Sequence, residues 1–489
     1  MDRLPDRFQT LALVVAAGAG IALLSVAALA GGLPAPLAFG LGAVLLLLCS
    51  MTYLAAVVDP AWSLSGAVIL SCFSGNWYAF GLPGAVAPDR LLLVAGLGAL
   101  LLRAPSALHR PDLPLRPVHW LMGVAVLYAV ASAALAGTLF DTTSMFRLVD
   151  RYGIVPFLVF LVAPVAFRTE AQRQILLTAF VVFGAYLGLT AFFERIGPRA
   201  LVFPRFILDP TVGIHPGRAR GPFLEAVSNG FGLYVGATAA TIALLTWRGR
   251  GRRLAAKAVI GLCVLGILLT VTRSVWVGSA AALLVTMLAA RELRRYVLPA
   301  VIGVALLIGG LLVSVPAIAG QAERRAGTER TVWERDALNT AAINMYEERP
   351  LFGFGWGRYI EISDGYMEQA DDYPLIKLTG ITVHNVFLSH LSELGLVGLT
   401  LWVAILVAAV AGAFTTRGPP ELRPWRIGRL GVVVCWLVVA MLVNPLSFPM
   451  LILFVWAGVA TGLPEPQAEG AAATEPGSLS PRVGAVAAP

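Results

Sequence analysis

The sequence has few charged residues and almost no lysine. Charged residues make up 13% of its 489 residues and hydrophobic residues 58%, with a mean hydropathy of +0.80. A soluble domain has too little interior to bury this much apolar surface, so the composition predicts a protein that lies in lipid. Only Lys257 and Lys377 are lysines, and arginine supplies nearly all of the 36 basic residues. The overall excess of arginine carries no functional information, so only the positions of individual arginines enter the argument.

The sequence also lacks the signatures of several common sites. Its four cysteines, Cys49, Cys72, Cys263 and Cys435, lie in apolar runs without CxxC spacing. This pattern predicts small buried hydrophobic side chains rather than a disulfide framework or a zinc site. The sequence contains no P-loop, no GxGxxG fingerprint, no internal repeat and no cluster of metal-ligand residues.

Long apolar runs dominate what remains. Because a bilayer core needs about 20 apolar residues per helix, the sequence predicts an all-α polytopic integral membrane protein with about 12–14 transmembrane helices. The candidate spans lie near residues 9–30, 36–58, 64–82, 90–103, 118–137, 152–167, 174–193, 226–247, 256–271, 274–290, 297–316, 385–413, 430–443 and 446–462.

Arginines in alternate loops predict the orientation of the chain. Basic clusters follow every second span, and such clusters mark cytoplasmic loops. They lie within 103–116, 168–173, 248–257, 291–295 and 417–429. An even number of spans then places both termini in the cytoplasm. The segments between these loops are expected to face outward, including 138–151, whose Arg147 and Arg151 have no role that the sequence assigns.

The predicted organisation has five parts. Residues 1–200 form N-terminal transmembrane helices, 201–316 form transmembrane helices with outer-face arginine motifs, 317–383 form an extracytoplasmic loop, 384–463 form C-terminal transmembrane helices, and 464–489 form a disordered tail rich in Ala, Gly and Pro. The loop contains an amphipathic helix that ends at Pro350. Its apolar face is predicted to hold Trp333, Ala337, Leu338, Ala341, Ala342 and Met345.

Three arginines on the predicted outer side are candidates for anion binding. Arg218 and Arg220 occur in "GRARGPF", just before a span, and Arg273 occurs in "TVTRSVWVG", between two spans. A guanidinium at this depth is costly unless it snorkels or has an anionic partner. We expect the three to converge on a phosphate or diphosphate. The alternative is that each side chain snorkels to lipid headgroups.

The segment "TVHNVFLSHLSELGLVG" places two histidines at the mouth of a span. His384 is a candidate general base because an unperturbed imidazole titrates near neutrality, although composition alone favours an interfacial histidine without a catalytic role. His390 and Glu393 lie three residues apart on one helix face and are predicted to form a structural hydrogen-bonded pair. Gly395 and Gly398 are predicted to allow close helix packing.

A run of glycines precedes this helix. Gly353, Gly355 and Gly357 in "PLFGFGWGRY" weakly resemble a phosphate-cradling loop, but no strand precedes them and no clear helix follows. A tight turn that supports Trp356 and Tyr359 near a sugar-binding face is an equally good interpretation.

Four of these segments, in order, resemble the O-antigen ligase and polymerase superfamily of bacterial membrane glycosyltransferases. The resemblance covers roughly residues 210–410 and is carried by "RARGPF", "TVTR", "RPLFGFGWG" and "HNVFLSHLSELGLVG". Thr272 replaces the serine of the family's Thr-x-Ser-Arg element, and the family's frequent Pro-Asn step after Phe223 is absent, which leaves the donor or acceptor end in question.

The resemblance implies glycan transfer on the outer face of the bacterial cytoplasmic membrane. The donor would be a glycan on undecaprenyl diphosphate, and the acceptor a sugar hydroxyl of a glycan or glycolipid; no metal, cofactor or nucleic acid is expected. Arg218 or Arg220, together with Arg273, would neutralise the leaving diphosphate. His384 would deprotonate the acceptor with inversion at the anomeric carbon, and Asn385 would support it. Ligase and polymerase remain alternatives, as does a flippase for the same lipid-linked glycan.

Overall fold

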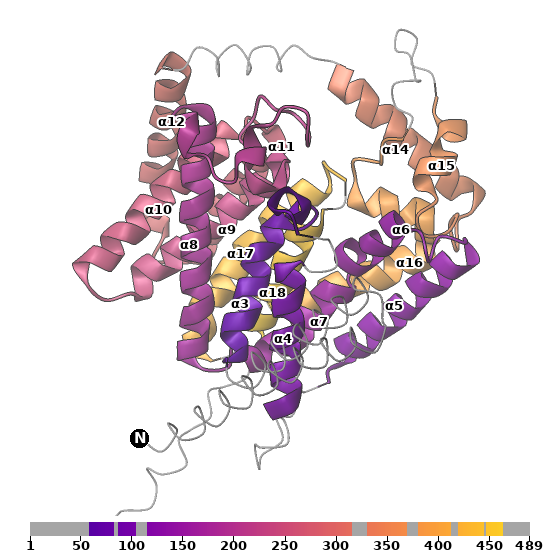
Figure 1. Ribbon diagram of the computed structural model, residues 1–489, viewed down its shortest axis with the longest axis horizontal. Helices are drawn as coiled ribbons and strands as arrows, with labels where there is room; N and C mark the ends of the chain where they lie inside the picture. The colour runs from indigo at the N-terminus through magenta and orange to yellow at the C-terminus, as the bar shows by residue number, and fades with distance from the viewer. Residues whose placement is uncertain are drawn as a thin grey trace, which may run out of the picture.

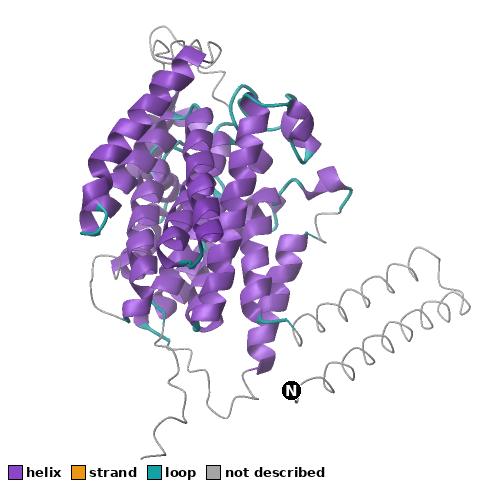
Figure 2. Cartoon of the chain, turned by 90° about the vertical axis from the view of Figure 1, so that its left-hand side faces the viewer, coloured by secondary structure: helices purple, strands orange, loops and turns teal. Residues whose placement is uncertain are grey.

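The described part of the chain consists of helices and the turns between them. The computed structural model describes residues 58–82, 87–103, 115–314, 330–368, 380–411, 419–444 and 446–462, and these residues contain no strand (Figures 1 and 2). The predicted all-α class is therefore confirmed. The principal helices are α3 (Pro60–Leu70), α4 (Pro88–Arg103), α5 (Pro117–Leu135), α7 (Ile154–Ala166), α8 (Glu170–Arg195), α9 (Ala226–Thr246), α10 (Arg250–Leu269), α11 (Arg273–Ala289), α12 (Val297–Ser314), α14 (Arg330–Glu348), α16 (Val386–Val410), α17 (Arg423–Ala440) and α18 (Ser447–Ala460).

Short helical elements join these helices. They are α6 (Thr142–Phe146), α15 (Tyr359–Ile362), the π-helical turn η4 (Arg147–Tyr152), and the 3-10 turns η1 (Ser71–Phe73), η2 (Trp77–Phe80), η5 (Arg199–Leu201), η6 (Arg205–Leu208), η7 (Gly221–Phe223), η8 (Arg294–Tyr296), η9 (Ser363–Tyr366) and η12 (Pro420–Leu422). The predicted span 64–82 is an α-helix only to Leu70. After that residue the chain continues through η1, turns at Gly75 (φ 85°) and forms η2.

Several described helices are long and apolar enough to cross a bilayer. Within the described residues these are Pro117–Leu135, Thr142–Ala166, Glu170–Arg195, Ala226–Thr246 and Val386–Val410. Shorter apolar helices occur at Pro60–Phe73, Arg273–Ala289 and Ser447–Ala460. The polytopic membrane architecture is therefore confirmed, whereas the number of crossings and their orientation stay predictions. The predicted spans 9–30 and 36–58, Cys49 and the tail 464–489 lie outside the described residues, apart from Val58 itself.

Small residues bring α8, α9 and α10 together on the left of Figure 1. A Cβ placed on Gly184 of α8 would lie 2.8 Å from the Cα atom of Gly236 in α9, and one on Gly188 would lie 2.9 Å from the Cβ of Leu262 in α10. Helices in lipid associate through such close backbone approach, because lipid supplies no hydrophobic driving force between them. Cys72, Cys263 and Cys435 are buried free thiols, as predicted.

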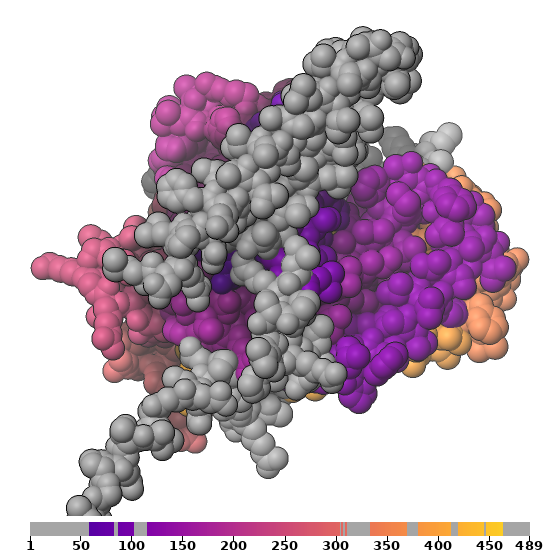
Figure 3. Space-filling model, turned by 60° about the horizontal axis from the view of Figure 1, so that its bottom comes forward, coloured from indigo at the N-terminus to yellow at the C-terminus, as the bar shows by residue number. Residues whose placement is uncertain are grey.

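The C-terminal half packs against α5 on the other side of the molecule, where the purple α5 region lies beside the orange segments in Figure 3. A Cβ on Gly398 would lie 2.8 Å from the ring of Tyr128, and the Tyr128 hydroxyl donates to the Leu394 carbonyl at 2.7 Å. The prediction that Gly398 allows close packing is confirmed.

The amphipathic helix of the predicted loop is α14. Its residues Ala337, Leu338, Ala341, Ala342 and Met345 are buried, as predicted, and the helix packs against α16. Trp333 is 47% exposed, so its assignment to the buried face is wrong. In the turns before Ala337, the Glu334 and Arg335 side chains are half-buried. Those turns carry charged side chains toward the start of α16.

Candidate active site

A tight reversal between α10 and α11 presents Arg273. Only residues 270–272 separate the two helices, and Val271 adopts a left-handed conformation with φ of 45°. A β-branched residue rarely takes this conformation, and such strain persists only where the surrounding structure enforces it. Arg273 is the first residue of α11, and its side chain is exposed. The strained reversal therefore holds one guanidinium at the end of the helix pair.

Arg218 lies against this reversal. The Ala219 amide donates to the Leu269 carbonyl at 3.1 Å, which attaches the "RARGPF" segment to the end of α10. Arg218 Nη1 donates to Thr272 Oγ1 at 3.4 Å. Two segments that are 54 residues apart in the chain are thereby joined. The structure brings Arg218 and Arg273 to the same end of the bundle.

Arg220 has a different environment. Its side chain is 1% exposed, and its terminal nitrogens donate to the carbonyls of Val212 (2.6 Å), Ile207 (2.8 Å) and Asp209 (2.9 Å). The Glu194 carboxylate accepts from the Arg220 backbone amide at 3.1 Å. These bonds fold the loop between α8 and α9 around the guanidinium. Arg220 therefore holds the loop, and Arg218 is the arginine of this segment that lies beside Arg273.

His384 is positioned by the residue that follows it. Asn385 Oδ1 accepts from the backbone amides of Phe387 (2.9 Å) and Leu388 (3.2 Å), so Asn385 is the N-cap of α16. An Asn cap stabilises a helix start by about 1 kcal/mol relative to alanine. His384 stands just outside this cap, half-buried, and its Nδ1 has no hydrogen-bond partner within the described structure. The His-Asn pair thus consists of a projecting imidazole and the cap that fixes its place.

Two side chains of α14, which sequence reasoning missed, set the charge around His384. Burial lowers the pKa of His384 below its ordinary value, and the nearby Arg335 guanidinium lowers it further, while Glu334 acts in the opposite direction. The pKa of Arg335 is itself lowered by burial and then by Arg273. Arg335 therefore acts on both Arg273 and His384, in keeping with the packing of α14 against α16. In the sequence, Glu334 and Arg335 belong to the polar face of an amphipathic helix, and nothing separates them from ordinary solvated charges.

The assembled site contains three guanidinium groups and one imidazole from four separate segments. Arg218 precedes α9, Arg273 begins α11, Arg335 lies in the first turns of α14, and His384 precedes α16. In Figure 1, α11 and α14 lie toward the top of the molecule. Guanidinium groups gathered in this way bind phosphate through charge-assisted hydrogen bonds. Within the described ranges no three His, Cys, Asp or Glu side chains group as metal ligands, and a metal-independent reaction stays a prediction.

Helix α16 is broken at Gly395, two residues beyond Glu393. Gly395 has φ of 66° and ψ of −170°, which interrupts the helical hydrogen bonds. The turn after α14 fills the interruption: the Pro350 carbonyl accepts from the Leu396 amide at 2.8 Å, and the Leu351 carbonyl from the Val397 amide at 3.2 Å. A Cβ at Gly395 would collide with the Leu351 carbonyl oxygen. Gly395 therefore permits a helix break rather than the close helix packing that the sequence predicted.

The glycine run also hydrogen-bonds to α16, to the residues that come just before the break at Gly395. The amides of Phe354 and Gly355 donate to the carbonyls of Ser392 (3.1 Å) and Glu393 (2.8 Å). Gly353 has φ of 67°, and a Cβ there would lie 2.6 Å from the Glu393 carbonyl. Backbone groups inside a bilayer must be paired, and the "PLFGFG" turn pairs those that the break exposes. The phosphate-cradle interpretation of this run is therefore wrong.

The aromatic residues of this turn are not a binding face. Trp356 and Tyr359 are 2% and 1% exposed, so the alternative of a sugar-binding surface here is also wrong. The Trp356 indole donates to the Ser144 carbonyl at 2.9 Å, and the Tyr359 hydroxyl donates to the Leu338 carbonyl at 2.8 Å. Both side chains fasten the turn to the helices around it.

Glu393 pairs with Arg147 rather than with His390. The Arg147 guanidinium donates to both carboxylate oxygens, at 3.1 and 3.0 Å, and its carbon lies 5.2 Å from the centre of the Trp356 ring. Both nitrogens of His390 are without a hydrogen-bond partner within the described structure. Its ring packs instead against Tyr152, Trp356 and Trp402. The predicted His390–Glu393 bond is not formed because a stronger, charged partner from η4 reaches the carboxylate.

A comparison with family models identifies the segment that holds this site. Residues 258–403 match the family described as O-antigen ligase (Wzy_C). This segment is similar to an O-antigen ligase domain. The match supports membership of the O-antigen ligase/polymerase superfamily, which the sequence motifs predicted. No curated protein matches the chain.

The O-antigen ligase domain contains most of the described site. The matched segment runs from α10 to α16 and includes Arg273, Arg335, His384 and the broken helix with its glycine turn. Arg218 precedes the matched segment, but its hydrogen bond to Thr272 joins it to the domain. The matched segment and the loop before α9 therefore contribute to one candidate site.

Proposed function

We propose that the protein transfers a glycan from undecaprenyl diphosphate to a sugar hydroxyl at the outer face of the cytoplasmic membrane. The observation that carries the proposal is the grouping of Arg273, Arg335 and His384 within the segment that matches the O-antigen ligase family, to which a hydrogen bond to Thr272 joins Arg218. Three cations and one imidazole suit a reaction in which a diphosphate leaves while a hydroxyl loses its proton. The outer placement rests on the basic loops, which alternate with the spans.

In the proposed reaction, the acceptor hydroxyl oxygen attacks the anomeric carbon of the donor glycan. The bond between that carbon and the diphosphate oxygen breaks, and its electron pair leaves with the undecaprenyl diphosphate. Negative charge grows on the leaving oxygen as the bond lengthens. The arginines stabilise this charge more strongly in the transition state than in the bound donor, which is the condition for acceleration. In-line attack inverts the anomeric configuration.

His384 receives the proton of the acceptor hydroxyl. Its lowered pKa favours the neutral imidazole at physiological pH, which is the form that can accept a proton. The imidazolium that forms is disfavoured by Arg335 and favoured by Glu334. We propose Glu334 as the residue that stabilises the protonated state, and Asn385 as the residue that fixes the ring's position.

The buried Arg147–Glu393 pair bears on the flippase alternative. A transporter is expected to place mobile charged residues near the bilayer midplane. Glu393 lies inside a predicted span and Arg147 in the helix Thr142–Ala166, but the two groups pair with each other and the carboxylate also accepts from the Tyr359 amide at 3.3 Å. The pair fits a rigid clamp between η4 and α16, and we retain transfer as the proposed function.

Deletion of the gene tests the proposal and separates its alternatives. A ligase predicts accumulation of long lipid-linked chains on the outer leaflet, and a polymerase predicts single lipid-linked repeat units there. The wild-type gene and an Arg199→Gln variant, altered at an exposed loop arginine, are expected to restore the surface glycan, whereas His384→Ala is not. Accumulation on the cytoplasmic leaflet alone would instead support a flippase and contradict the proposal.

A further inference from the structure

Backbone hydrogen bonds hold the main chain on both sides of Arg218. The Arg218 amide donates to the His215 carbonyl at 3.1 Å, and the Ala219 amide donates to the Leu269 carbonyl of α10 at 3.1 Å. These two bonds fix the peptide units before and after Arg218. The position of the guanidinium therefore depends on how firmly the neighbouring peptides are held.

Asn229 of α9 holds the next peptide unit with its side chain. Its Nδ2 donates to the Ala219 carbonyl at 3.0 Å, and the Glu194 carboxylate accepts from the Arg220 amide, on the other side of the same peptide, at 3.1 Å. Gly221 follows with φ of 55°, and a Cβ there would lie 2.4 Å from Asn229 Oδ1. One side chain of α9 thus contacts both the peptide next to Arg218 and the turn after it.

The environment of Asn229 makes an amide side chain costly. Asn229 is 0% exposed and lies in the first turn of α9, inside a predicted span. A buried amide costs free energy unless its polar atoms make hydrogen bonds. Its Oδ1 has no hydrogen-bond partner within the described residues, so the donor to Ala219 is the part of the amide that is used. A leucine would fill a similar volume without this cost and without this bond.

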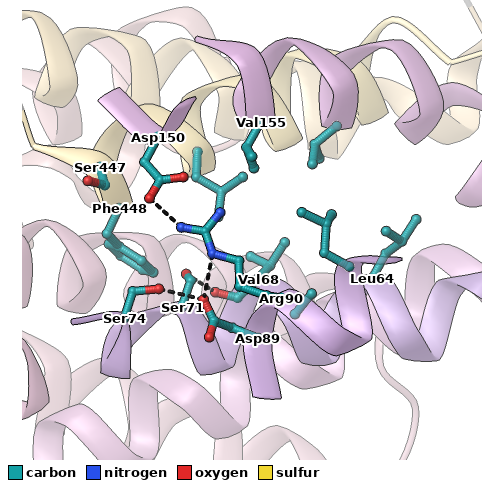
Figure 4. Close-up of a pocket in the computed structure, with 14 residues that line it drawn as sticks. Leu64, Val68, Ser71, Ser74, Asp89, Arg90, Asp150, Val155, Ser447 and Phe448 are labelled. Atoms are coloured by element: carbon teal, nitrogen blue, oxygen red, sulfur yellow. Dashed lines mark hydrogen bonds and ion pairs between the residues drawn. The ribbon is translucent and has the colours of Figure 1, made fainter. Parts of the chain in front are cut away.

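The end of the same segment has separate supports. The Pro222 carbonyl accepts from Asn76 Nδ2 at 3.1 Å, and the Phe223 ring lies 4.7 Å from the ring of Phe448 at the start of α18. Figure 4 shows Phe448 among the residues that line a cavity. A change at Asn229 is therefore expected to release the peptide beside Arg218 and to leave the end of the segment in place.

We propose that Asn229 is a positioning residue, which directs Arg218 toward the diphosphate of the donor by holding the Ala219 carbonyl. The proposal rests on the proposed transfer function and adds a residue that the sequence did not single out. Asn229 acts through Arg218, because its hydrogen bond goes to the main chain of that segment. A guanidinium binds phosphate best with both nitrogens aligned, and a displacement of about 1 Å can lower a rate about 10²-fold.

A double-mutant cycle on diphosphate binding tests the assignment without relying on transfer. Farnesyl diphosphate is titrated into full-length protein in phosphatidylcholine nanodiscs, and its Kd is measured by calorimetry. Arg218→Gln is expected to weaken binding about tenfold or more, since it removes a charge-assisted hydrogen bond. Asn229→Leu is expected to weaken binding at least about fivefold in the wild-type background and less than about twofold in the Arg218→Gln background, because coupled residues are not additive.

A matched control and a second variant complete the design. Thr241→Val removes a hydrogen bond to the Ala237 carbonyl farther along α9 and should leave Kd unchanged in both backgrounds. Equal weakening by Asn229→Leu in the two backgrounds would show that Asn229 acts independently of Arg218 and would overturn the proposal. An unchanged Kd in Asn229→Leu would overturn it as well. If Asn229→Leu does not fold, Asn229→Asp keeps the size without the donor, and the proposal then requires the same coupling in that variant.

Transfer kinetics supply a second readout and separate the two proposals. Asn229→Leu should lower kcat and leave the acceptor KM unchanged, and this effect should disappear in the Arg218→Gln background. A protein that shows the coupling in binding but transfers no glycan keeps the positioning role and loses the proposed function. A protein that transfers glycan but shows no coupling keeps the function and loses the positioning role.

Discussion

The ion pair between Arg147 and Glu393 offers the sharpest test of how the site is supported. Glu393 is fully buried and Arg147 is 6% exposed, so neither group has water as an alternative partner. Glu393→Gln keeps the shape of the side chain but leaves the Arg147 cation without its counter-charge. Breaking a buried pair by removing one partner costs about 3–5 kcal/mol. The perturbation acts on α16 less than three turns beyond His384.

That cost predicts a measurable loss of thermal stability. At roughly 2 °C per kcal/mol, the low end for a large chain, Tm should fall by about 6–10 °C. Removing both charges with well-packed apolar residues can restore stability, because no uncompensated ion remains. The double variant Arg147→Met/Glu393→Leu is therefore expected to melt higher than Glu393→Gln.

Fluorescence-detected thermal unfolding in a single detergent measures the three proteins side by side. The exposed pair of Arg423 and Glu292, 2.9 Å apart, supplies a matched control, and Glu292→Gln should melt as the wild type does because exposed pairs contribute little. If Glu393→Gln also melts as the wild type does, the pair does not clamp the helix. A double variant less stable than Glu393→Gln would likewise refute the reasoning.

Three further predictions concern the site itself. Gly395→Ala forces a left-handed φ on alanine and should abolish folded protein, measured by size-exclusion chromatography. Arg218→Gln should fold normally and lower the transfer rate about 10²–10³-fold, as expected for a lost anion-stabilising group, whereas Arg220→Gln should lower Tm because it releases the loop carbonyls. Wild-type kcat should fall only below pH 6.5, because His384 has a lowered pKa and stays neutral to a lower pH than an ordinary imidazole; Arg335→Gln removes a repelling charge and should move this acidic limb to higher pH. Equal stability of both arginine variants, or an unmoved limb, would contradict these assignments.

The fold was largely predictable because lipid imposes a simple rule on sequence. Spans need long apolar runs, and the described runs are helical. The motifs also pointed to Arg218 and Arg273, which the structure brings to the same end of the bundle, while their role and that of His384 stay predictions. Both inferences rest on patterns within short stretches of the sequence.

The rest of the site could not be predicted from the sequence, because it is formed by contacts between segments that are far apart in the chain. Nothing near Glu393 in the sequence indicates Arg147, which lies 246 residues away and takes the carboxylate from His390. The sequence could not show that the glycine run pairs the backbone groups of a broken helix. The break at Gly395 forms only when the two segments pack together. Arg335 looked like any charge on an amphipathic helix until α14 packed beside His384.

The central claim is that His384 accepts the acceptor's proton beside a diphosphate site formed by arginines. It is tested most directly by the pH dependence of transfer from an undecaprenyl-diphosphate-linked glycan by purified protein in nanodiscs. The account predicts that His384→Gln lowers kcat by about 10²–10⁴-fold, leaves donor binding unchanged and removes the acidic limb of the profile. A His384→Gln enzyme that keeps both its rate and its acidic limb would contradict the account.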